Sequence, residues 1–263
     1  MITEKVFAII KRDAITALRY RNGFILAAGA QAAQFATFYY LARSVGPQFR
    51  PDGMPYFLFL LVGTGFYTFL LAGVHSFLRT IQESQQTGTL EILLTSSTSP
   101  PTLVFLSAFS SFAGGLFQFV LLLAAGLVVG ASAIHANVGA CLLVFALSLL
   151  ITFALGLFSA GVQISTHKGS AVLWLIGSGS WLLSGTLFPV SALPRFARLL
   201  AYCVPFTHSL LGLRLALLNG SSSALMREIE VLALFSLLLV PLSVLLFSSA
   251  VRHARQSGTL AFY

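Results

Sequence analysis

The sequence predicts an all-α, polytopic membrane protein with six transmembrane helices. Of its 263 residues, 57% are hydrophobic and only 8% are charged, whereas soluble domains carry about 25% charged residues. A soluble protein of this size needs a polar surface, and this chain has too few charges to build one. The 24 phenylalanines and the many aliphatic residues also exclude an intrinsically disordered chain.

Six stretches without Asp, Glu, Lys or Arg are long enough to cross the hydrocarbon core, which takes about 20 apolar residues in a helix. They are predicted at residues 24–42, 55–77, 102–131, 138–165, 171–190 and 231–251. None of these stretches contains an acidic residue. This argues against a proton- or sodium-coupled carrier, because such carriers place ionisable groups near the membrane centre.

Residues 1–22 are predicted to form an amphipathic helix at the cytoplasmic interface, ahead of a six-span domain at 23–263. Apolar side chains share one arc of a helical wheel and basic side chains the opposite arc, which is typical of a helix on an anionic leaflet. No cleavable signal peptide is visible in this segment. With the N-terminus inside, nine of the 15 basic residues lie in cytoplasmic segments, which favours cytoplasmic N- and C-termini.

The predicted cytoplasmic loop at residues 78–101 is longer than a simple connector requires. Gly88 permits a sharp turn, and Glu91 is expected in the first turn of a short helix, where the helix dipole favours an acid. Leu90, Leu93 and Leu94 give this helix a small apolar face. Such a face needs a partner protein or the lipid interface, and the pattern alone favours the interface.

Residues 191–218 differ from the six spans, because Arg195, Arg198 and Arg214 interrupt the apolar sequence and Pro205 breaks it. This segment is predicted to form two short helices on the outer side that enter the membrane only to partial depth. Burying one of these arginines in hydrocarbon would cost about 2.5–3.5 kcal/mol. Their side chains are therefore expected to snorkel to the outer headgroups.

Two motifs stand at matching places in this topology. The first reads Glu83…Thr87-Gly-Thr-Leu-Glu91…Leu94…Ser99-Pro, and the second, before the sixth span, reads Ser184-Gly…Phe188-Pro…Leu193-Pro…Pro205…Arg214. With the amphipathic N-terminal helix and the six spans, they make the chain resemble the ABC-2 type permeases over essentially its whole length. These permeases are membrane subunits of ATP-driven exporters. The run Ser96-Ser-Thr-Ser99 departs from the Thr-Pro pair that relatives often carry, which leaves the end of the first motif open.

The resemblance implies a coupling helix in the first cytoplasmic loop that docks on a separate nucleotide-binding ATPase subunit. The residues assigned to this coupling are Glu83, Thr87, Gly88, Thr89, Leu90, Glu91 and Leu94. The resemblance also implies re-entrant outer helices between spans five and six. The expected assembly is a permease dimer, most simply a homodimer, with two ATPase subunits in the bacterial plasma (inner) membrane.

The chain itself is not expected to be an enzyme. It contains no G-x-x-x-x-G-K-[ST] loop, so ATP and Mg are expected on the partner ATPase and no cofactor on this chain. No nucleic-acid partner is expected, because the basic residues flank apolar spans. The five histidines form no metal-ligand motif, and Leu182 replaces the first glycine of a G-x-S-G motif, which weakens a catalytic pairing of Ser184 with His208.

The predicted function is to form the transmembrane path for ATP-driven outward transport of an amphipathic, lipid-like or glycan-type substrate. The candidate path residues are polar or aromatic side chains in or beside the spans: Gln34, Phe38, Tyr39, Trp181, Phe188 and Arg214. Glutamines in spans can instead form interhelical hydrogen bonds, aromatics can anchor at the interface, and Arg214 can bind a lipid phosphate. A secondary transporter and an intramembrane serine-protease-like enzyme, both without an ATPase partner, are the alternatives.

Overall fold

The protein is an assembly of helices in a computed structural model that describes residues 21–89, 102, 104–105, 114–116, 118–124, 126, 136–166, 168–218 and 222–257. Every regular element in these ranges is a helix, which confirms the predicted all-α class. The elements in chain order are α2 (Arg21–Val45), η1 (Pro51–Gly53), α3 (Tyr56–Gln86), α6 (Val138–Thr166), α7 (Gly169–Leu183), η3 (Val190–Ala192), α8 (Arg195–Tyr202), α9 (Pro205–Leu217) and α10 (Ser222–Ser257).

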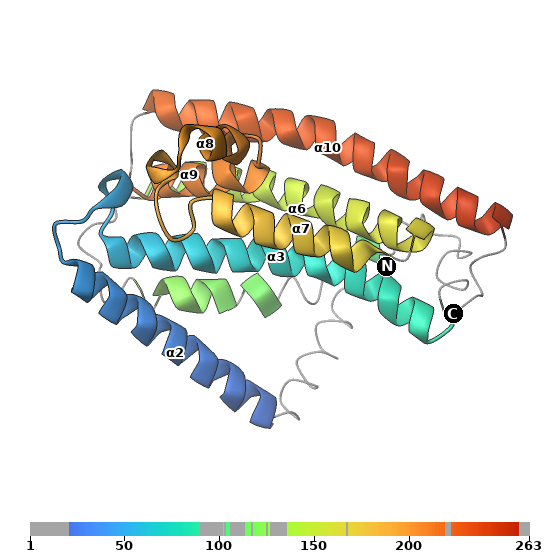
Figure 1. Ribbon diagram of the computed structural model, residues 1–263, viewed down its shortest axis with the longest axis horizontal. Helices are drawn as coiled ribbons and strands as arrows, with labels where there is room; N and C mark the ends of the chain where they lie inside the picture. Colours follow the sequence, from blue (N-terminus) through green and yellow to red (C-terminus); the bar gives the residue numbers. More distant parts are fainter. Residues whose placement is uncertain are drawn as a thin grey trace.

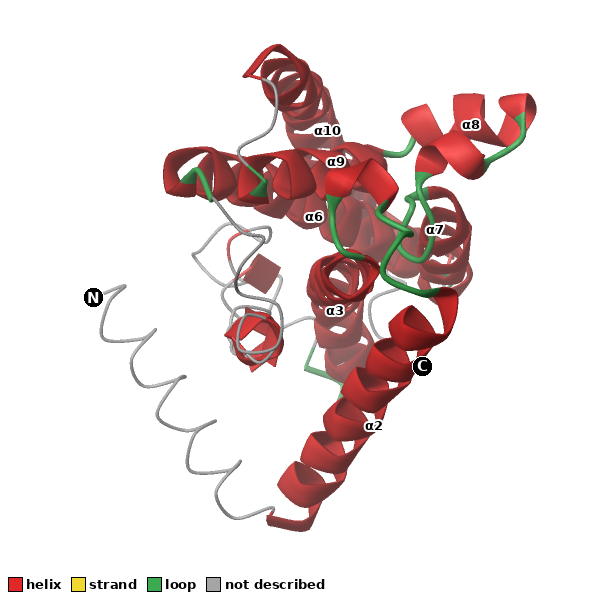
Figure 2. Cartoon of the chain, turned by 90° about the vertical axis from the view of Figure 1, so that its left-hand side faces the viewer, coloured by secondary structure: helices red, strands yellow, loops and turns green. Residues whose placement is uncertain are grey.

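Helix α3 lies at the centre of the bundle. Viewed end on, it is surrounded by α2, α6, α7 and α9 (Figure 2). Side by side with it run α6 and α7, whereas α2 crosses at a steep angle and α10 covers the far side of α6 (Figure 1). In its most apolar stretch, 78% of the residues are buried. Burial of this kind follows from a sequence that is apolar on almost every face.

Small residues let the central helices approach closely. A Cβ atom on Gly156 of α6 would come within 2.6 Å of the Phe77 ring of α3. A Cβ atom on Gly161 would lie 3.3 Å from the backbone of Phe247 in α10. Close backbone contact at glycine is a common way for membrane helices to associate, because lipid gives no hydrophobic drive between them.

Three helices of the described chain are long and apolar enough to cross a membrane, namely α3, α6 and α10. The number rises to four if α8 and α9, which meet at an angle of 86°, together form one span. The chain is thus a multi-pass membrane protein, but six spans are not confirmed. Helix α2 covers the first predicted span without being one of these three, and α7 has only 15 residues. Most of the third predicted span lies outside the described residues, apart from an apolar helix at Gly114–Ala124.

Two predicted boundaries are wrong. Helix α3 continues past residue 77 to Gln86, so the predicted loop at 78–101 begins as helix. It ends in a Schellman motif, in which the N–H groups of Gly88 and Thr89 donate to the carbonyls of Gln85 and Ser84. Gly88 has φ +68°, which confirms the predicted turn there. Helix α7 ends at Leu183 and not at residue 190, where the fifth span was predicted to end, because the chain turns at Gly185 with φ +73°.

The two short helices predicted within 191–218 are present as α8 and α9, but they differ in burial. Helix α8 leaves Phe196 and Leu199 exposed, as expected for a helix at an interface. Helix α9 is packed against α6 and α10, and it buries polar residues such as His208 and Ser209. Helix α9 is thus buried among other helices and α8 is not, and the depth to which the two helices enter the membrane stays a prediction.

The prediction that Arg214 snorkels to the membrane surface is also wrong. Its side chain is 1% exposed and donates hydrogen bonds to the carbonyls of Gly185 (2.8 Å), Phe59 (3.1 Å) and Thr186 (3.4 Å). The guanidinium also lies 3.5 Å above the Phe59 ring, which is a cation–π contact. We call this set of contacts the Arg214 latch. It joins α9, the start of α3 and the turn after α7.

The latch requires a glycine on α3. A Cβ atom on Gly63 would come within 2.2 Å of Nη2 of Arg214 and 2.6 Å of the carbonyl oxygen of Thr186. The oxygen belongs to the backbone, and the guanidinium is buried and held by its bonds to Gly185 and Phe59, so neither shifts without a loss of contacts. Gly63 and Arg214 therefore form one structural unit.

Replacing Arg214 by Met is expected to lower the free energy of unfolding by about 2–4 kcal/mol, because the variant leaves buried carbonyls without donors. Unfolding of the purified protein in mixed micelles measures this loss. The Arg195→Met variant is the control, since Arg195 is exposed on α8. Gly63→Ala is expected to cause a loss of similar size. Equal stability of Arg214→Met and the control would contradict the latch.

Candidate functional site

A groove of about 1020 Å³ runs between α3 and α7. Along α3 it extends from Tyr67 to Gln82, which corresponds to about 22 Å of helix. The residues that line it are Tyr67, Thr68, Leu71, Ala72, His75, Ser76, Leu78, Arg79, Gln82, Ser170, Leu173, Trp174, Gly177, Ser178 and Trp181. Its mixed polar and aromatic wall suits a ligand that is itself amphipathic.

The α3 wall of the groove is an exposed stripe on an otherwise buried helix. Thr68, Ala72, His75 and Arg79 are exposed, and their spacing of four, three and four residues places them on one face of the helix. Three of these four residues are polar. Polar and ionisable side chains in a membrane helix are costly unless they face water, a cavity or a polar partner. This face of α3 is therefore expected to lie against water, a cavity or a polar partner.

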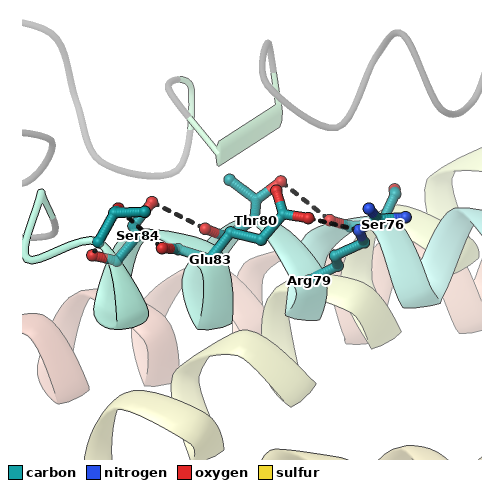
Figure 3. A network of polar contacts seen from close by, with 6 residues as sticks. Ser76, Arg79, Thr80, Glu83 and Ser84 are labelled. Carbon is teal, nitrogen blue, oxygen red and sulfur yellow. Dashed lines mark hydrogen bonds and ion pairs between the residues drawn. The ribbon is translucent and has the colours of Figure 1, made fainter. Parts of the chain in front are cut away.

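Several polar groups near the end of this stripe bond within α3 itself, and Arg79 does so through its Nε atom alone. Figure 3 shows Ser76, Arg79, Thr80, Glu83 and Ser84 along this stretch, with the ion pair between Arg79 and Glu83 one turn apart. The hydroxyl groups of Thr80 and Ser84 donate to the carbonyls one turn earlier. These local bonds explain why the helix persists through a polar sequence.

At the Gln86 end of α3, side-chain amides join this helix to α6 and α7. Gln82 donates to the hydroxyl of Ser170 on α7 at 2.8 Å. Gln163 of α6 donates to Oε1 of Gln85 at 2.9 Å and accepts the Gly169 N–H at 3.0 Å. Gln163 thus binds the end of α3 and the start of α7 at the same time. Of the two sequence interpretations for the glutamines, interhelical hydrogen bonding is the one observed at Gln163.

At the opposite end, the Arg214 latch holds the same two helices. It contacts Phe59 in α3 and the carbonyls of Gly185 and Thr186, directly after α7. Between the two ends, the Tyr67 hydroxyl donates to the carbonyl of Gly177 in α7. The groove is therefore held at both ends and at one point along its floor, while its outer side stays open.

Both tryptophans of the chain line this groove. Trp174 is 70% exposed and Trp181 is 42% exposed. Large exposed aromatics on one face indicate a binding surface or a contact with lipid. Their seven-residue spacing on α7 puts them on the same face, two turns apart.

The family of the chain follows from a comparison with known protein families. A family model described as ABC-2 type transporter matches residues 4–218. The chain belongs to the ABC-2 type transporter family. This confirms the resemblance drawn from the two motifs, and it makes the chain a transport component. A comparison with curated proteins found no match.

The predicted path residues of this ABC-2 protein do not lie together. Trp181 lines the groove, whereas Gln34 lines a separate crevice of about 40 Å³ between α2, α3 and the helix at Gly114–Ala124. Phe38 is buried, and Tyr39 is 39% exposed with its ring edge-on to Phe57. Phe188 is half-buried after α7, and Arg214 is enclosed in its latch. Their roles in transport stay predictions.

The predicted coupling residues lie at and beyond the end of α3. Glu83 is in the last turns of the helix, and Thr87, Gly88 and Thr89 form its C-terminal turn. The hydroxyl groups of Thr87 and Thr89 are 2.8 Å apart. The three remaining coupling residues, Leu90, Glu91 and Leu94, lie outside the described residues, as does the predicted interfacial helix up to residue 20.

Sequence reasoning missed His75 and Arg79 as lining residues. Their polar spacing with Thr68 along one helical face was the available signal, but the predicted end of the span at residue 77 separated Arg79 from the others. It also missed a buried pair in which Nδ1 of His208 lies 2.6 Å from Oε2 of Glu228. The His208 ring thus contacts Glu228, and the Ser184 hydroxyl donates a hydrogen bond to the carbonyl of Ser180. The structure therefore does not pair Ser184 with His208.

Replacing Gln163 by Met is expected to lower the free energy of unfolding by about 2 kcal/mol. The variant keeps the side-chain length but removes the acceptor of the buried Gly169 N–H and the donor to Gln85. Thermal unfolding of the purified protein in detergent measures the effect. Gln86→Met, at an exposed position of α3, is the matched control. If both variants unfold at the same temperature, Gln163 does not tie α3 to α7.

Proposed function

We propose that the chain is the permease subunit of an ABC exporter, and that the groove between α3 and α7 is its half of the path for an amphipathic, lipid-like or glycan-type substrate. The observation that carries this proposal is the exposed polar stripe on α3, the most buried of the three candidate spans. In a membrane, such a stripe is stable where it lines a hydrated route or contacts a polar ligand.

The proposed path is completed by a second copy of the chain. The groove is open along one side, while its ends are held by the Arg214 latch and by Gln163. Two such grooves facing each other enclose a route between two sets of rigid walls. A homodimer is the simplest assembly that supplies the second wall, because two-fold symmetric contacts use the same surface twice.

Energy for transport is proposed to come from two copies of a separate ATPase that binds ATP and Mg. The sequence contains no P-loop of its own. The proposed docking element is the coupling segment at residues 87–94, which follows directly on the Schellman turn of α3. Movement of this segment would act on α3, and through Gln163 and Gln82 on the start of α7. The two walls of the groove would then respond together.

The proposed orientation places both termini in the cytoplasm of a bacterial cell, with the permease in the inner membrane. The basic residues of the N-terminal segment support this orientation. In it, the Gln86 end of α3 faces the cytoplasm and α8 and α9 form re-entrant helices on the outer side. The exposed apolar residues of α8, such as Phe196, then lie at the outer interface.

Filling the groove is expected to block transport. Ser178 is exposed on α7 between the two tryptophans, so Ser178→Trp places a bulky ring in the proposed path. Proteoliposomes that hold the permease with its ATPase are expected to lose ATP-dependent movement of a fluorescent phospholipid or a lipid-linked oligosaccharide by about tenfold or more. Leu237→Trp is the matched control, because Leu237 is 72% exposed on α10, outside the groove.

Equal transport by the Ser178→Trp and Leu237→Trp proteins would contradict a path through this groove. Absence of ATP-driven movement of both probes by the wild-type complex would count against the exporter itself.

Uncoupling is expected when Leu90 and Glu91 are both replaced by Ala. The double variant removes an apolar contact and an acid from the coupling segment, while the helical bundle stays folded. Co-purification of the ATPase and the coupled rate of ATP hydrolysis are both expected to fall, and thermal unfolding of the permease alone is expected not to change. Arg252→Ala, at an exposed position near the end of α10, is the control. Full ATPase association and transport by the double variant would disprove the docking role.

A further inference from the structure

The groove between α3 and α7 carries a distinctive charge pattern. Arg79 and His75 line it on α3 toward the Gln86 end. None of its described lining residues is acidic. The remaining polar groups of its side chains are hydroxyls, two indole N–H groups and one amide, which carry no charge. A ligand in this groove therefore meets one permanent positive charge and no negative charge within the wall.

The guanidinium of Arg79 is free to bind an anion. Its Nε atom pairs with Oε1 of Glu83, which lies one turn further along α3 and is not part of the groove wall. The two terminal nitrogens have no hydrogen-bond partner in the described part of the chain. A guanidinium fork of this kind binds a phosphate or carboxylate through two parallel hydrogen bonds. His75 lies one turn earlier on the same face, and its imidazole ring supplies a further hydrogen-bond donor.

The rest of the groove is suited to an apolar body. Trp174 and Trp181 present large exposed surfaces from α7. Leu71 of α3 and Leu173 of α7 are further apolar lining residues. The cavity volume of about 1020 Å³ is at the upper end of the range for small-molecule sites, which is about 300–1,000 Å³. An alkyl chain or a flat ring system with one charged end fits this distribution.

We propose that the groove binds an amphipathic anion, with the phosphate or carboxylate group at Arg79 and the apolar body along Trp174 and Trp181. The inference rests on the proposed function, since it names the charge class of the substrate for the same groove. It narrows the amphipathic substrates that the family resemblance implies to those that carry a negative headgroup. Charge complementarity selects this class, because an uncharged headgroup gains less from the guanidinium than an anion does and a cationic one is repelled.

Intrinsic tryptophan fluorescence tests the proposal, because both tryptophans of the chain line the groove. The purified full-length protein, in nanodiscs of phosphatidylcholine, is titrated with dodecyl phosphate, dodecylphosphocholine and dodecyl maltoside. These probes share one tail and differ in the charge of the headgroup. A saturable change in fluorescence is expected for dodecyl phosphate at concentrations at least about tenfold below those needed for the other two. Trp174→Phe is expected to reduce the signal, which assigns it to the groove.

Three variants separate the effect of the Arg79 charge on binding from the effect of the shape of the groove. Arg79→Gln is expected to weaken binding of dodecyl phosphate by about tenfold and to leave binding of dodecyl maltoside unchanged. Glu83→Gln breaks the same ion pair but keeps the cation, so it is expected to bind dodecyl phosphate at least as tightly as the wild type. Arg43→Gln, an exposed arginine on α2 outside the groove, is expected to behave as the wild type. Equal affinity for the three probes, or equal losses in Arg79→Gln and Glu83→Gln, would overturn the proposal.

Nanodiscs that contain phosphatidylglycerol identify the source of the anion. If phosphatidylglycerol competes with dodecyl phosphate, a membrane lipid enters the groove. If it does not compete, only a free amphiphile enters. Both outcomes support an anion site, because both depend on Arg79. The measurement needs neither ATP nor an ATPase. Anion binding without transport in proteoliposomes would thus reject the exporter and keep the site, whereas transport without charge-dependent binding would do the reverse.

Discussion

The buried charge of Arg214 is the constraint on which the arrangement around the groove depends. A guanidinium that is 1% exposed needs hydrogen-bond acceptors, and here it finds backbone carbonyls in place of a carboxylate. Gly185 and Thr186 supply two of them, because α7 ends at Leu183 and these two residues form the turn that follows it. Phe59 supplies the third from α3. The short length of α7, the glycine at position 63 and the burial of α9 all belong to this one set of contacts.

The two ends of the groove are built from different chemistry, and both join α3 to its neighbours through buried polar bonds. One end uses a cation on carbonyls, and the other uses the amide of Gln163 between Gln85 and the Gly169 N–H. Such bonds are directional and fail when a helix shifts by a fraction of a turn. The helices that line the groove are thereby fixed relative to each other, and the open side is the part that a partner or a ligand has room to occupy.

Polar residues in the apolar sequence have three different roles. The first is interhelical bonding, as at Gln163 and in the bond from the Ser148 hydroxyl to that of Ser209. The second is local bonding within one helix, as at Thr80 and Ser84. The third is exposure on a shared face, as at Thr68, His75 and Arg79. Only the third role bears on the proposed transport path, and residue type alone does not distinguish it from the other two.

Composition by itself determined that the chain is a membrane protein. The long uninterrupted apolar stretches determined that its spans are helices, because a helix crosses the hydrocarbon core with about 20 apolar residues and satisfies its own backbone. The motifs determined the family, and Gly88 determined the turn that ends α3.

The sequence did not place that turn at the end of a helix. The polar run after residue 77 has the composition of a loop, and only the structure shows that its hydroxyls and its ion pair bond within α3. Nor did the sequence distinguish the buried α9 from the more exposed α8. Only the tertiary structure decided that α9 is buried, that Arg214 faces carbonyls and that α3 keeps one exposed polar face. These outcomes depend on contacts between residues far apart in the chain, such as Phe59 and Arg214, and no local pattern encodes them.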